Sequence, residues 1–585
     1  MLRVANCSGF YGDRLSAARE MVEGGPIDVL TGDWLAELTM LILAGNRRNG
    51  RPGYAPTFLA QLEQVLGTCL ERGIRIVSNA GGLDPAGCAA AVSELADRLG
   101  LRVRVACVTG DDLTGDLGVL GDAVNADTGE KLTATPLTAN AYLGGRPIAA
   151  ALAAGADVVV TGRVTDAALV TGPGIWRYGW GPGDHDALAG SVVAGHVIEC
   201  GCQATGGNYA FFGEVPDLPH CGFPLVELEA DGSGVVTKHP GTGGTVSVGT
   251  VTAQLLYEIG SPRYLGPDVT ARFDTIRLEQ QGPDRVRISG VRGDAPPETL
   301  KVAVTYPAGY RNTMTMVLTG LDIEAKARLA LDAVWARVPR DSFEQVHVEL
   351  TPLAGTALLR VTVMDPDRGK AGRAFSAAVV ETGLASYPGF HGLAPPGDAS
   401  PYGVYWPCLV PADAVRPRVL LDGREVPADP PPSPAGASGA AVPPPAPETL
   451  RPSSPQAVRP SPRQVVRASL PVGGGPTLRA PLGTIAGARS GDKGGNANLG
   501  VWTGTAERFA WLSEHLTAGR LRELLPETAG LVVERFDLPN LLALNFVVHG
   551  LLGRGVASSP RMDAQAKALG EELRAAVTDI PRALL

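Results

Sequence analysis

Cysteine is scarce in this sequence, with eight among 585 residues, and the spacing between them is irregular. Such a set excludes a disulfide framework and predicts reduced thiols in a reducing compartment. The sequence also lacks a run or stripe of lysine and arginine, and its formal net charge is −9. A nucleic-acid partner is therefore not expected.

Long hydrophobic runs are missing as well. The apolar stretch Ile148–Val160 is interrupted by Asp157 and is shorter than the ~20 residues that a membrane-spanning helix needs. The first residues lead directly into a predicted strand, Leu2–Asn6, and show none of the regions of a signal peptide. We therefore expect a soluble, cytoplasmic protein with no membrane partner.

Proline, in contrast, is concentrated in one segment. Residues 428–465 include Pro430–Pro432 and Pro443–Pro445 and show no apolar periodicity. This composition predicts a disordered linker rich in proline, alanine and serine. The linker would divide a long N-terminal region from a C-terminal domain at 466–585, and the length of the chain allows two to four domains.

Residues 1–265 alternate predicted strands and helices, which indicates an α/β domain around a parallel sheet. Helices are expected at Pro56–Arg72 and Ala86–Leu99, and strands at Leu2–Asn6, Ile27–Leu30, Ile74–Asn79, Val103–Thr109 and Val158–Thr161. Polar, glycine-rich residues follow these strands, and such sheets bind ligands at the carboxyl ends of their strands. We therefore predict one site at that edge. The binding candidates there are Ser8, Gly9, Asn79, Gly81 and Gly82.

The pattern changes after this domain. Residues 266–427 combine alternating strands with an amphipathic helix at Glu324–Val338, which is typical of an α+β extension. Two of its strands are expected at Leu300–Tyr306 and Thr313–Leu318. Residues 466–585 are expected to form two β-β-α halves, with a hairpin around 482–502 and a last helix at Asp563–Val577. This arrangement predicts a ferredoxin-like α+β domain.

The segment Gly195–Tyr209 holds the densest group of reactive side chains. His196 and Glu199 lie three residues apart and would share a helix face, so either could act as a general base. Cys200 and Cys202 follow directly. One of them could be a nucleophile activated by His196, or both could be small buried hydrophobic side chains, and we favour the second interpretation. The spacing fits no standard zinc site, and no metal is predicted.

Arg163 and Asp166 follow a strand that should be buried. They form either a local salt bridge or a clamp for a carboxylate or phosphate, and we favour the clamp. Together with His196 and Glu199 they are our candidates for catalysis.

Five further carboxylates lie near strand ends, at Asp33, Glu37, Asp111, Asp112 and Asp116. Paired carboxylates could do acid–base chemistry or hold Mg²⁺. Capping of the helices that follow explains Asp33 and Asp111 equally well, and we favour it.

A glycine-rich loop runs from Lys238 to Val246. It matches neither the P-loop nor the dinucleotide fingerprint. Backbone N–H groups beside a lysine would still suit a phosphate or carboxylate, and a structural turn is the alternative. The binding candidates in this loop are Lys238, Gly241, Thr242, Gly243 and Gly244.

A second glycine-rich loop, Arg489–Trp502, is the most informative stretch of the chain. Its backbone could form an anion-binding nest, or it could be a plain hairpin in which Asp492 and Lys493 pair. The binding candidates here are Ser490, Gly491, Asp492, Lys493, Gly494, Asn496 and Asn498.

Several of these strings together resemble the acyclic terpene utilisation AtuA family. They are Asn79–Pro85, Gly162–Ala168, Gly195–Gly207, Lys238–Gly244 and Ser490–Asn496. The resemblance covers Val4 to about Tyr264 and the C-terminal domain, but not the linker. It implies an N-terminal AtuA domain, a ferredoxin-fold C-terminal domain, and a place in the catabolism of citronellol- or geraniol-like terpenes and other branched acids, without implying a particular reaction.

Residues and resemblance together predict an enzyme that acts on a branched acyl-CoA or carboxylate as a hydratase, lyase or hydrolase. No redox cofactor is predicted, and coenzyme A would enter only as part of the substrate. The alternative is a non-catalytic accessory protein whose tethered C-terminal domain docks onto acyl-CoA carboxylase-type enzymes. A homo-oligomer is expected in either case.

Overall fold

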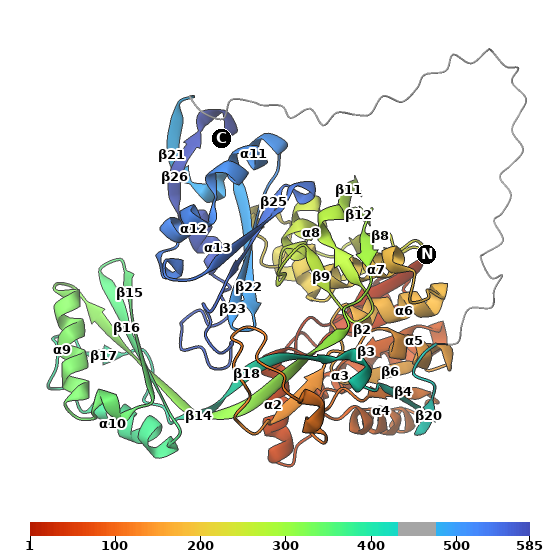
Figure 1. Ribbon diagram of the computed structural model, residues 1–585, viewed down its shortest axis with the longest axis horizontal. Helices are drawn as coiled ribbons and strands as arrows, with labels where there is room; N and C mark the ends of the chain where they lie inside the picture. Colours follow the sequence, from red (N-terminus) through yellow and green to blue (C-terminus); the bar gives the residue numbers. More distant parts are fainter. Residues whose placement is uncertain (431–474) are drawn as a thin grey trace, which may run out of the picture.

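The computed structural model describes residues 1–430 and 475–585. Three parts are visible in Figure 1: a large α/β body, a smaller lobe beside it, and the C-terminal domain packed on top of the body. Apart from residues 428–430, the predicted linker at 428–465 lies outside the described residues. Within the described ranges, no helix has both the length and the hydropathy needed to cross a lipid bilayer.

The body is built on an 11-stranded sheet whose centre is parallel. In spatial order, the five parallel strands are β1 (Leu2–Asn6), β2 (Val29–Gly32), β3 (Arg75–Ser78), β6 (Val158–Thr161) and β4 (Val105–Thr109). The predicted parallel sheet is therefore present as this central part of a mixed sheet.

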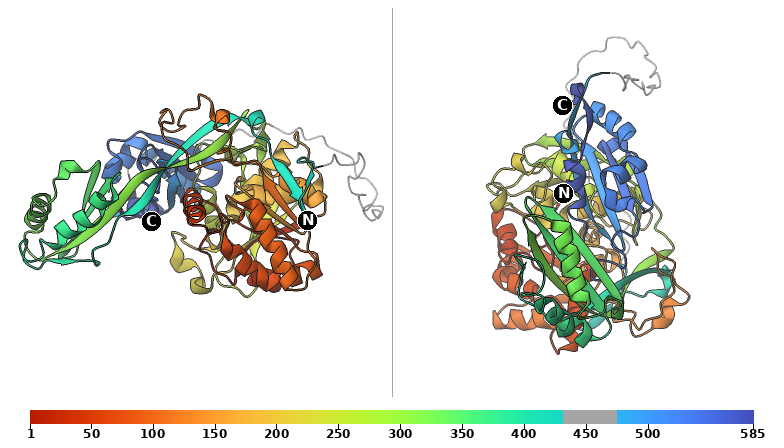
Figure 2. Two further views of the ribbon diagram at one scale, coloured as in Figure 1. Left: turned by 90° about the horizontal axis from the view of Figure 1, so that it is seen from below. Right: turned by 90° about the vertical axis from the view of Figure 1, so that its left-hand side faces the viewer.

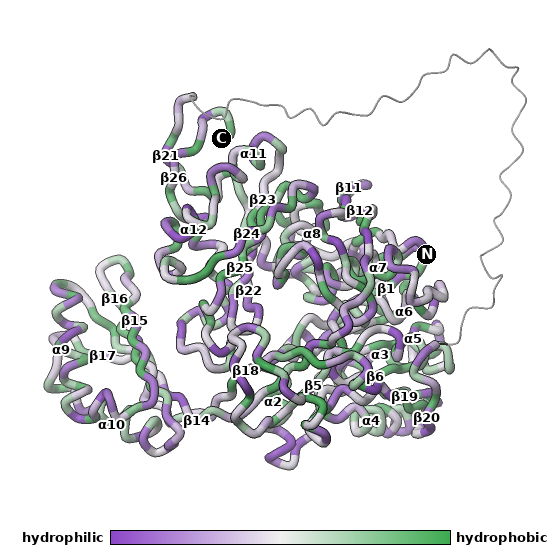
Figure 3. The backbone as a smooth tube through the Cα atoms, in the orientation of Figure 1, coloured by the Kyte–Doolittle hydropathy of each residue, from purple (hydrophilic) through white to green (hydrophobic). Residues whose placement is uncertain are grey.

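Helices cover both faces of these strands, because alternate side chains point to opposite sides of a sheet. Val4 and Val159 face one core, with α5 (Arg146–Ala153), α6 (Ala168–Tyr178) and α7 (His185–Ile198). Ala5 and Val158 face the other, with α1 (Ala17–Gly24), α3 (Pro56–Arg72) and α4 (Pro85–Arg98). Figure 3 shows hydrophilic and hydrophobic residues following one another along the backbone.

Antiparallel strands extend the sheet at both edges. On one side lie β7 (Pro224–Leu228), β8 (Gly234–Lys238), β12 (Arg285–Ser289) and β11 (Arg277–Gly282), and on the other lie β19 (Arg418–Leu421) and β20 (Arg424–Val426). The predicted boundary at residue 265 therefore does not separate two sheets, because residues on its far side complete the first one.

One strand of 21 residues, β14 (Thr299–Thr319), connects the body with the lobe. Its first half pairs with β5 (Thr138–Ala141) and β18 (Ser400–Pro411), and its second half pairs with β16 (Thr356–Asp365), which pairs in turn with β15 (Gln345–Leu353). Figure 2 shows β14 running out of the body into this part, which we call the distal lobe (310–399). Helices α9 (Ile323–Trp335) and α10 (Phe375–Val380) pack there around a separate core.

Short elements complete the N-terminal region. They are α2 (Glu37–Arg48), α8 (Val248–Leu255), β9 (Arg263–Leu265), β10 (Thr270–Arg272), β13 (Arg292–Asp294) and β17 (His391–Gly392).

The C-terminal domain has a four-stranded antiparallel sheet in the order β22 (Ala486–Lys493), β23 (Asn496–Thr503), β25 (Ala543–Val548), β24 (Val533–Leu538). Helices α11 (Ala506–His515) and α12 (Ala518–Leu524) follow the first hairpin, and α13 (Leu569–Ala575) follows the second. The two β-β-α halves and the ferredoxin-like domain are therefore confirmed.

The last helix is shorter than predicted. Residues after Ala575 leave it and form β26 (Val577–Pro581), which pairs with β21 (Thr477–Pro481). Hydrogen bonding to this partner strand outweighs the helical periodicity of the segment.

The C-terminal sheet uses its two faces differently. One face holds the core of the domain itself. The other face contributes Trp502, Leu538 and Leu541 to the core of the body, and Trp502 stacks on Tyr209 with ring centroids 6.1 Å apart. The domain is thus packed against the body through apolar side chains.

Candidate functional site

Buried and partly buried titratable residues collect where the ends of the parallel strands meet the β22–β23 hairpin. They come from the loop after β6, from the end of α7, from the loop after α8 and from β22. We call this group the interdomain cluster; it consists of Arg163, Asp166, His196, Glu199, Glu258, Asp492 and Lys493. Its members are close enough that their charges influence one another's pKa values.

The strand ends are tied together by hydrogen bonds. The Nδ2 atom of Asn79 donates to Oδ1 of Asp33 over 2.6 Å, and its Oδ1 accepts from the backbone N–H of Trp34 over 2.8 Å. Burial and the charge of Asp166 raise the pKa of Asp33 well above its usual range. Gly9 packs so closely on Cys200 that a Cβ atom at this position would lie 2.6 Å from the Cys200 carbonyl carbon. Glycine therefore permits the contact between β1 and the end of α7.

Arg163 is buried and holds several groups at once. Its Nη1 donates to Oδ1 of Asp166 over 2.7 Å and to the carbonyl of Leu35 over 3.0 Å. The guanidinium also lies 4.3 Å from the ring centroid of Tyr142. The Asp166 side chain keeps 30% of its surface exposed, whereas that of Arg163 keeps 4%. Arg163 thus fixes Asp166 at an edge of the cluster that a ligand can reach.

Asp111 has a structural position beneath this clamp. Its Oδ2 accepts from the backbone N–H of Arg163 and from Nδ2 of Asn140, both over 2.8 Å. Asp112 closes a local turn through the N–H of Thr114. Among the described residues, no group of three or more His, Cys, Asp or Glu side chains could hold a metal ion.

His196 and Glu199 form a buried pair at the end of α7, with Nδ1 of the imidazole 3.2 Å from Oε1 of the carboxyl group. Neither ring nitrogen of His196 nor Oε2 of Glu199 makes a hydrogen bond of good geometry within the described ranges, although the backbone of Gln254 is close enough to His196 to raise its pKa against the effect of burial. The imidazole packs against the rings of Tyr264 and Phe273. Buried polar atoms are nearly always hydrogen-bonded in proteins, so Oε2 of Glu199 and the imidazole edge turned away from it are the positions where a ligand or an ordered water molecule is expected.

Burial controls the protonation of this pair. It lowers the pKa of His196 to about 4, against the opposing charge of Glu258. It also raises the pKa of Glu199 well above its usual range, with help from the charge of Asp166. Burial therefore favours the uncharged form of both partners, the neutral imidazole and the protonated carboxyl group.

The β22–β23 hairpin carries Lys493 and the asparagines to the body. Nζ of Lys493 donates to the carbonyl of Glu258 over 2.9 Å, and Oδ1 of Asn498 accepts from the N–H of the same residue over 2.7 Å. Nδ2 of Asn496 donates to Oδ1 of Asp127 over 3.0 Å. A Cβ atom on Gly491 would come within 2.5 Å of the Tyr257 ring. The hairpin is thus shaped to fit the body closely.

Ser490 differs from its neighbours in the hairpin. Its Oγ accepts from the N–H of Gly570 over 2.9 Å, which keeps it inside the C-terminal domain. Its place near the cluster is therefore structural.

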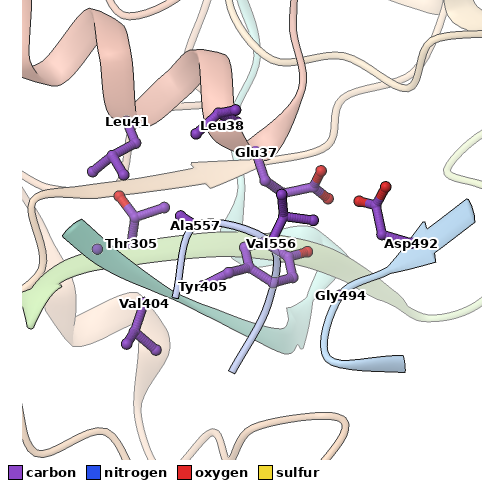
Figure 4. A pocket seen from close by; sticks show the side chains of 11 residues that line it. Glu37, Leu38, Leu41, Thr305, Val404, Tyr405, Asp492, Gly494, Val556 and Ala557 are labelled. Carbon is purple, nitrogen blue, oxygen red and sulfur yellow. The ribbon is translucent and has the colours of Figure 1, made fainter. Parts of the chain in front are cut away.

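A small pocket opens beside the cluster, lined by Glu37, Tyr405, Asp492 and neighbouring apolar residues. Figure 4 shows the carboxyl groups of Glu37 and Asp492 facing each other. Burial and the charges of Glu258 and Glu37 raise the pKa of Asp492 to about 7. The free volume is about 20 Å³, which is room for about one water molecule.

The loop after β8 has a different environment. Nζ of Lys238 donates to the carbonyl of Thr242 over 2.7 Å and lies 3.2 Å from Oδ2 of Asp284. Gly243 and Gly244 approach the segments around 205 and 217–221. The structure therefore brings Arg163, Asp166, His196, Glu199, Asp492 and Lys493 together, but it does not bring Lys238, Gly241, Thr242, Gly243 and Gly244 to them.

The cysteines beside the cluster are protonated. Burial and the charge of Glu199 raise the pKa of Cys200 well above its usual range. The thiol of Cys202 donates to the carbonyl of Cys221 over 3.3 Å. Both observations agree with the interpretation of these residues as small packing side chains.

Sequence reasoning missed several charged and aromatic residues near the cluster. Lys301 lies 3.9 Å from Oε1 of Glu37 and 4.7 Å from the ring centroid of Tyr142, and Nζ of Lys567 lies 3.6 Å from Oε1 of Glu258. In the sequence, Lys301 alternates with apolar residues and so resembles a solvent-facing strand position. Glu258 adopts a positive φ of 57° after α8, and the sequence contains no signal for that turn.

Comparison with known families gives two matches. The profile of the acyclic terpene utilisation family protein AtuA matches residues 2–421, and the profile of the AtuA ferredoxin-like domain matches residues 480–578. The first match treats the body and the distal lobe as one unit. Neither a curated protein nor a solved structure matches the chain.

Proposed function

This chain belongs to the acyclic terpene utilisation AtuA family, and from that premise we propose that it is an enzyme acting on a branched acyl-CoA thioester at the interdomain cluster. The family description supplies the coarse role in acyclic terpene utilisation. One observation carries the finer proposal, the buried His196–Glu199 pair with polar atoms that lack hydrogen-bond partners of good geometry among the described residues.

The protonation of this pair favours addition or elimination of water. Neutral His196 can accept a proton from water while the oxygen attacks the β-carbon of an unsaturated thioester, and protonated Glu199 can deliver a proton to the α-carbon. The product has gained one water molecule, and the pair is left as imidazolium and carboxylate. Because Nδ1 and Oε1 lie 3.2 Å apart, the proton can return from His196 to Glu199 and reset the site.

Positive charge near the pair would stabilise an enolate-like oxygen in the transition state. Arg163 and Lys493 are both close enough to lower the pKa of Glu199 against the effect of burial. Hydrolysis of the thioester by the same acid–base pair is a second reaction of this class.

The docking alternative would require Asp492 and Lys493 to lie on an open surface. The Asp492 side chain keeps only 14% of its surface exposed, and Lys493 is bonded to the body. This burial supports the enzyme proposal over the accessory one.

The test uses two histidine–carboxylate pairs with the same spacing. His196→Gln and Glu199→Gln should each lower kcat for hydration of a branched enoyl-CoA about 10²- to 10⁴-fold, with little change in KM. His220 pairs with Asp217 over 2.7 Å at the same i,i+3 spacing but is 80% exposed, so His220→Gln is the matched control and should retain wild-type turnover. Wild-type protein that neither turns over nor is thermally shifted by any acyl-CoA would refute the proposal.

A further inference from the structure

A second cleft lies between the distal lobe and the C-terminal domain. Its volume is about 350 Å³. Strands β14 and β16 contribute Arg311 and Arg360, and the loop after β25 contributes Ser559 and Arg561. We call it the arginine cleft.

The positive charge in this cleft is only partly neutralised. Arg360 pairs with Glu349 over 3.1 Å, and Arg561 pairs with Glu527. Arg311 donates to the carbonyl of Ser559 over 3.0 Å, and within residues 1–430 and 475–585 it forms no ion pair with a carboxylate. Burial and the charge of Arg360 lower the pKa of Arg311, as expected for a cation with no anionic partner.

One carboxylate also lines the cleft. Asp398 already pairs with Arg368, whose Nη2 lies 3.0 Å from its Oδ2. An anion entering the cleft would therefore meet more uncompensated positive than negative charge.

The loop also presents free hydrogen-bonding atoms. Oγ of Ser559 and Nε of Arg561 are buried and have no hydrogen-bond partner among the described residues. Ser559 as a whole is 3% exposed. The hydroxyl group of Ser559 and the three guanidinium groups around this space are donors of the kind that bind phosphate oxygens in proteins.

We propose that the arginine cleft binds a phosphate-bearing group and that, on the proposed substrate, it holds the phosphates of the CoA portion. This second part rests on the proposed function, whereas phosphate binding by the cleft does not. The pocket beside the interdomain cluster and the arginine cleft are built on the same two segments, β14 and the loop after β25. Thr305 and Ala557 line the pocket of Glu37 and Asp492, and Arg311 and Ser559 line the cleft.

The spacing along the shared strand fits an extended ligand. Arg311 lies six positions after Thr305 on β14, which corresponds to about 20 Å at ~3.3 Å per residue. A thioester at the interdomain cluster and phosphates in the arginine cleft would thus lie at opposite ends of one elongated molecule.

Calorimetric titration of the full chain tests this assignment, with CoA, dephospho-CoA, pantetheine and inorganic phosphate as ligands. Arg311→Gln should weaken CoA binding about tenfold or more and leave pantetheine binding unchanged. Arg328 is an exposed arginine of α9 on the same lobe, so Arg328→Gln is a control with the same change of charge and should bind CoA like the wild type. Thermal melting confirms that the variants fold.

The outcomes separate the two proposals. If Arg311→Gln and Arg328→Gln bind every phosphate ligand equally, the cleft assignment is wrong, even if enoyl-CoA is still hydrated at His196. If Arg311→Gln loses inorganic phosphate while CoA binds no better than phosphate does, the cleft takes a free phosphate compound and the link to CoA is wrong. If Arg311→Gln weakens binding of the phosphate-bearing ligands but the wild type turns over no thioester, phosphate binding by the cleft is supported and the proposed function is wrong.

Discussion

Two glycine-rich loops of this chain each carry a lysine, and the structure gives the two lysines opposite surroundings. Lys238 is 3.2 Å from Asp284 and donates to the carbonyl of its own loop. Lys493 donates to a backbone carbonyl across the domain interface and forms no ion pair with a carboxylate in the described part of the chain. Lys238 is neutralised by Asp284 from the turn between β11 and β12, whereas Lys493 approaches the carboxylates of the interdomain cluster without pairing directly with one of them. Glycine content and a flanking lysine are therefore insufficient to identify a ligand site.

The largest effect is expected from the titration of Asp492, the neighbour of Lys493. Its pKa of about 7 lies above the ordinary value of 3.8. The carboxyl group therefore contributes stability that is complete below the ordinary value and is lost as pH rises through about 7. Between about pH 5 and about pH 8 the wild type should lose about 3 kcal/mol of unfolding free energy relative to Asp492→Asn.

Urea unfolding of both proteins at the two pH values measures this difference. Parallel pH dependences for the wild type and Asp492→Asn would show that this carboxyl group does not titrate in the folded protein as proposed.

Replacing the two lysines should give crossed effects. Lys493→Met should lower kcat about 100-fold because it removes positive charge from the cluster, and it should cost about 1 kcal/mol of unfolding free energy because the Glu258 carbonyl loses its donor. Lys238→Met should leave kcat unchanged and lower the unfolding free energy by about 1–3 kcal/mol, because it leaves Asp284 and the Thr242 carbonyl without their partner.

Steady-state kinetics and urea melts on the same two variants separate the effects. A large loss of kcat in Lys238→Met would reverse the comparison and assign the first loop to the site.

The smallest effects concern the glycines of the two loops. Gly491→Ala should destabilise docking of the hairpin by about 1–3 kcal/mol, because its Cβ atom would lie 2.5 Å from the Tyr257 ring. Gly241 has a φ of +80°, but a Cβ atom there would have open space around it, so Gly241→Ala should cost about 1 kcal/mol of backbone strain. Protease sensitivity of the interface should rise only in Gly491→Ala, and equal sensitivity in both variants would contradict the role of this contact.

Local patterns predicted much of the secondary structure. The strands Leu2–Asn6 and Val158–Thr161 and the helix Pro56–Arg72 occur with the predicted bounds. The sequence pattern predicts two strands, Leu300–Tyr306 and Thr313–Leu318, where the structure has the single strand β14, and Pro307 and Gly309 lie between the two predicted segments. A register shift at these residues lets a single strand continue past them. The antiparallel edges of the large sheet join segments hundreds of residues apart, which no local pattern can indicate.

The candidate site could be predicted only in part, for a similar reason. His196 and Glu199 are three residues apart, so helix geometry already places them together. Their approach to Lys493 depends on the packing of the C-terminal domain, which a family resemblance can suggest but local periodicity cannot. Lys301 could not be predicted because its position in the strand pattern looks solvent-facing. Glu258 could not be predicted because it lies in a turn that has no sequence signal.

The strand β14 also limits how this architecture can diversify. The strand contributes residues to the pocket of Glu37 and Asp492 and to the arginine cleft, so its length sets the distance between these two sites. Outside the irregularity at Pro307–Gly309, inserting one residue would turn every side chain beyond it to the opposite face, so the regular part of the strand can be lengthened only in pairs, by about 7 Å each time. Relatives that process longer or shorter molecules would therefore be expected to differ here by even numbers of residues.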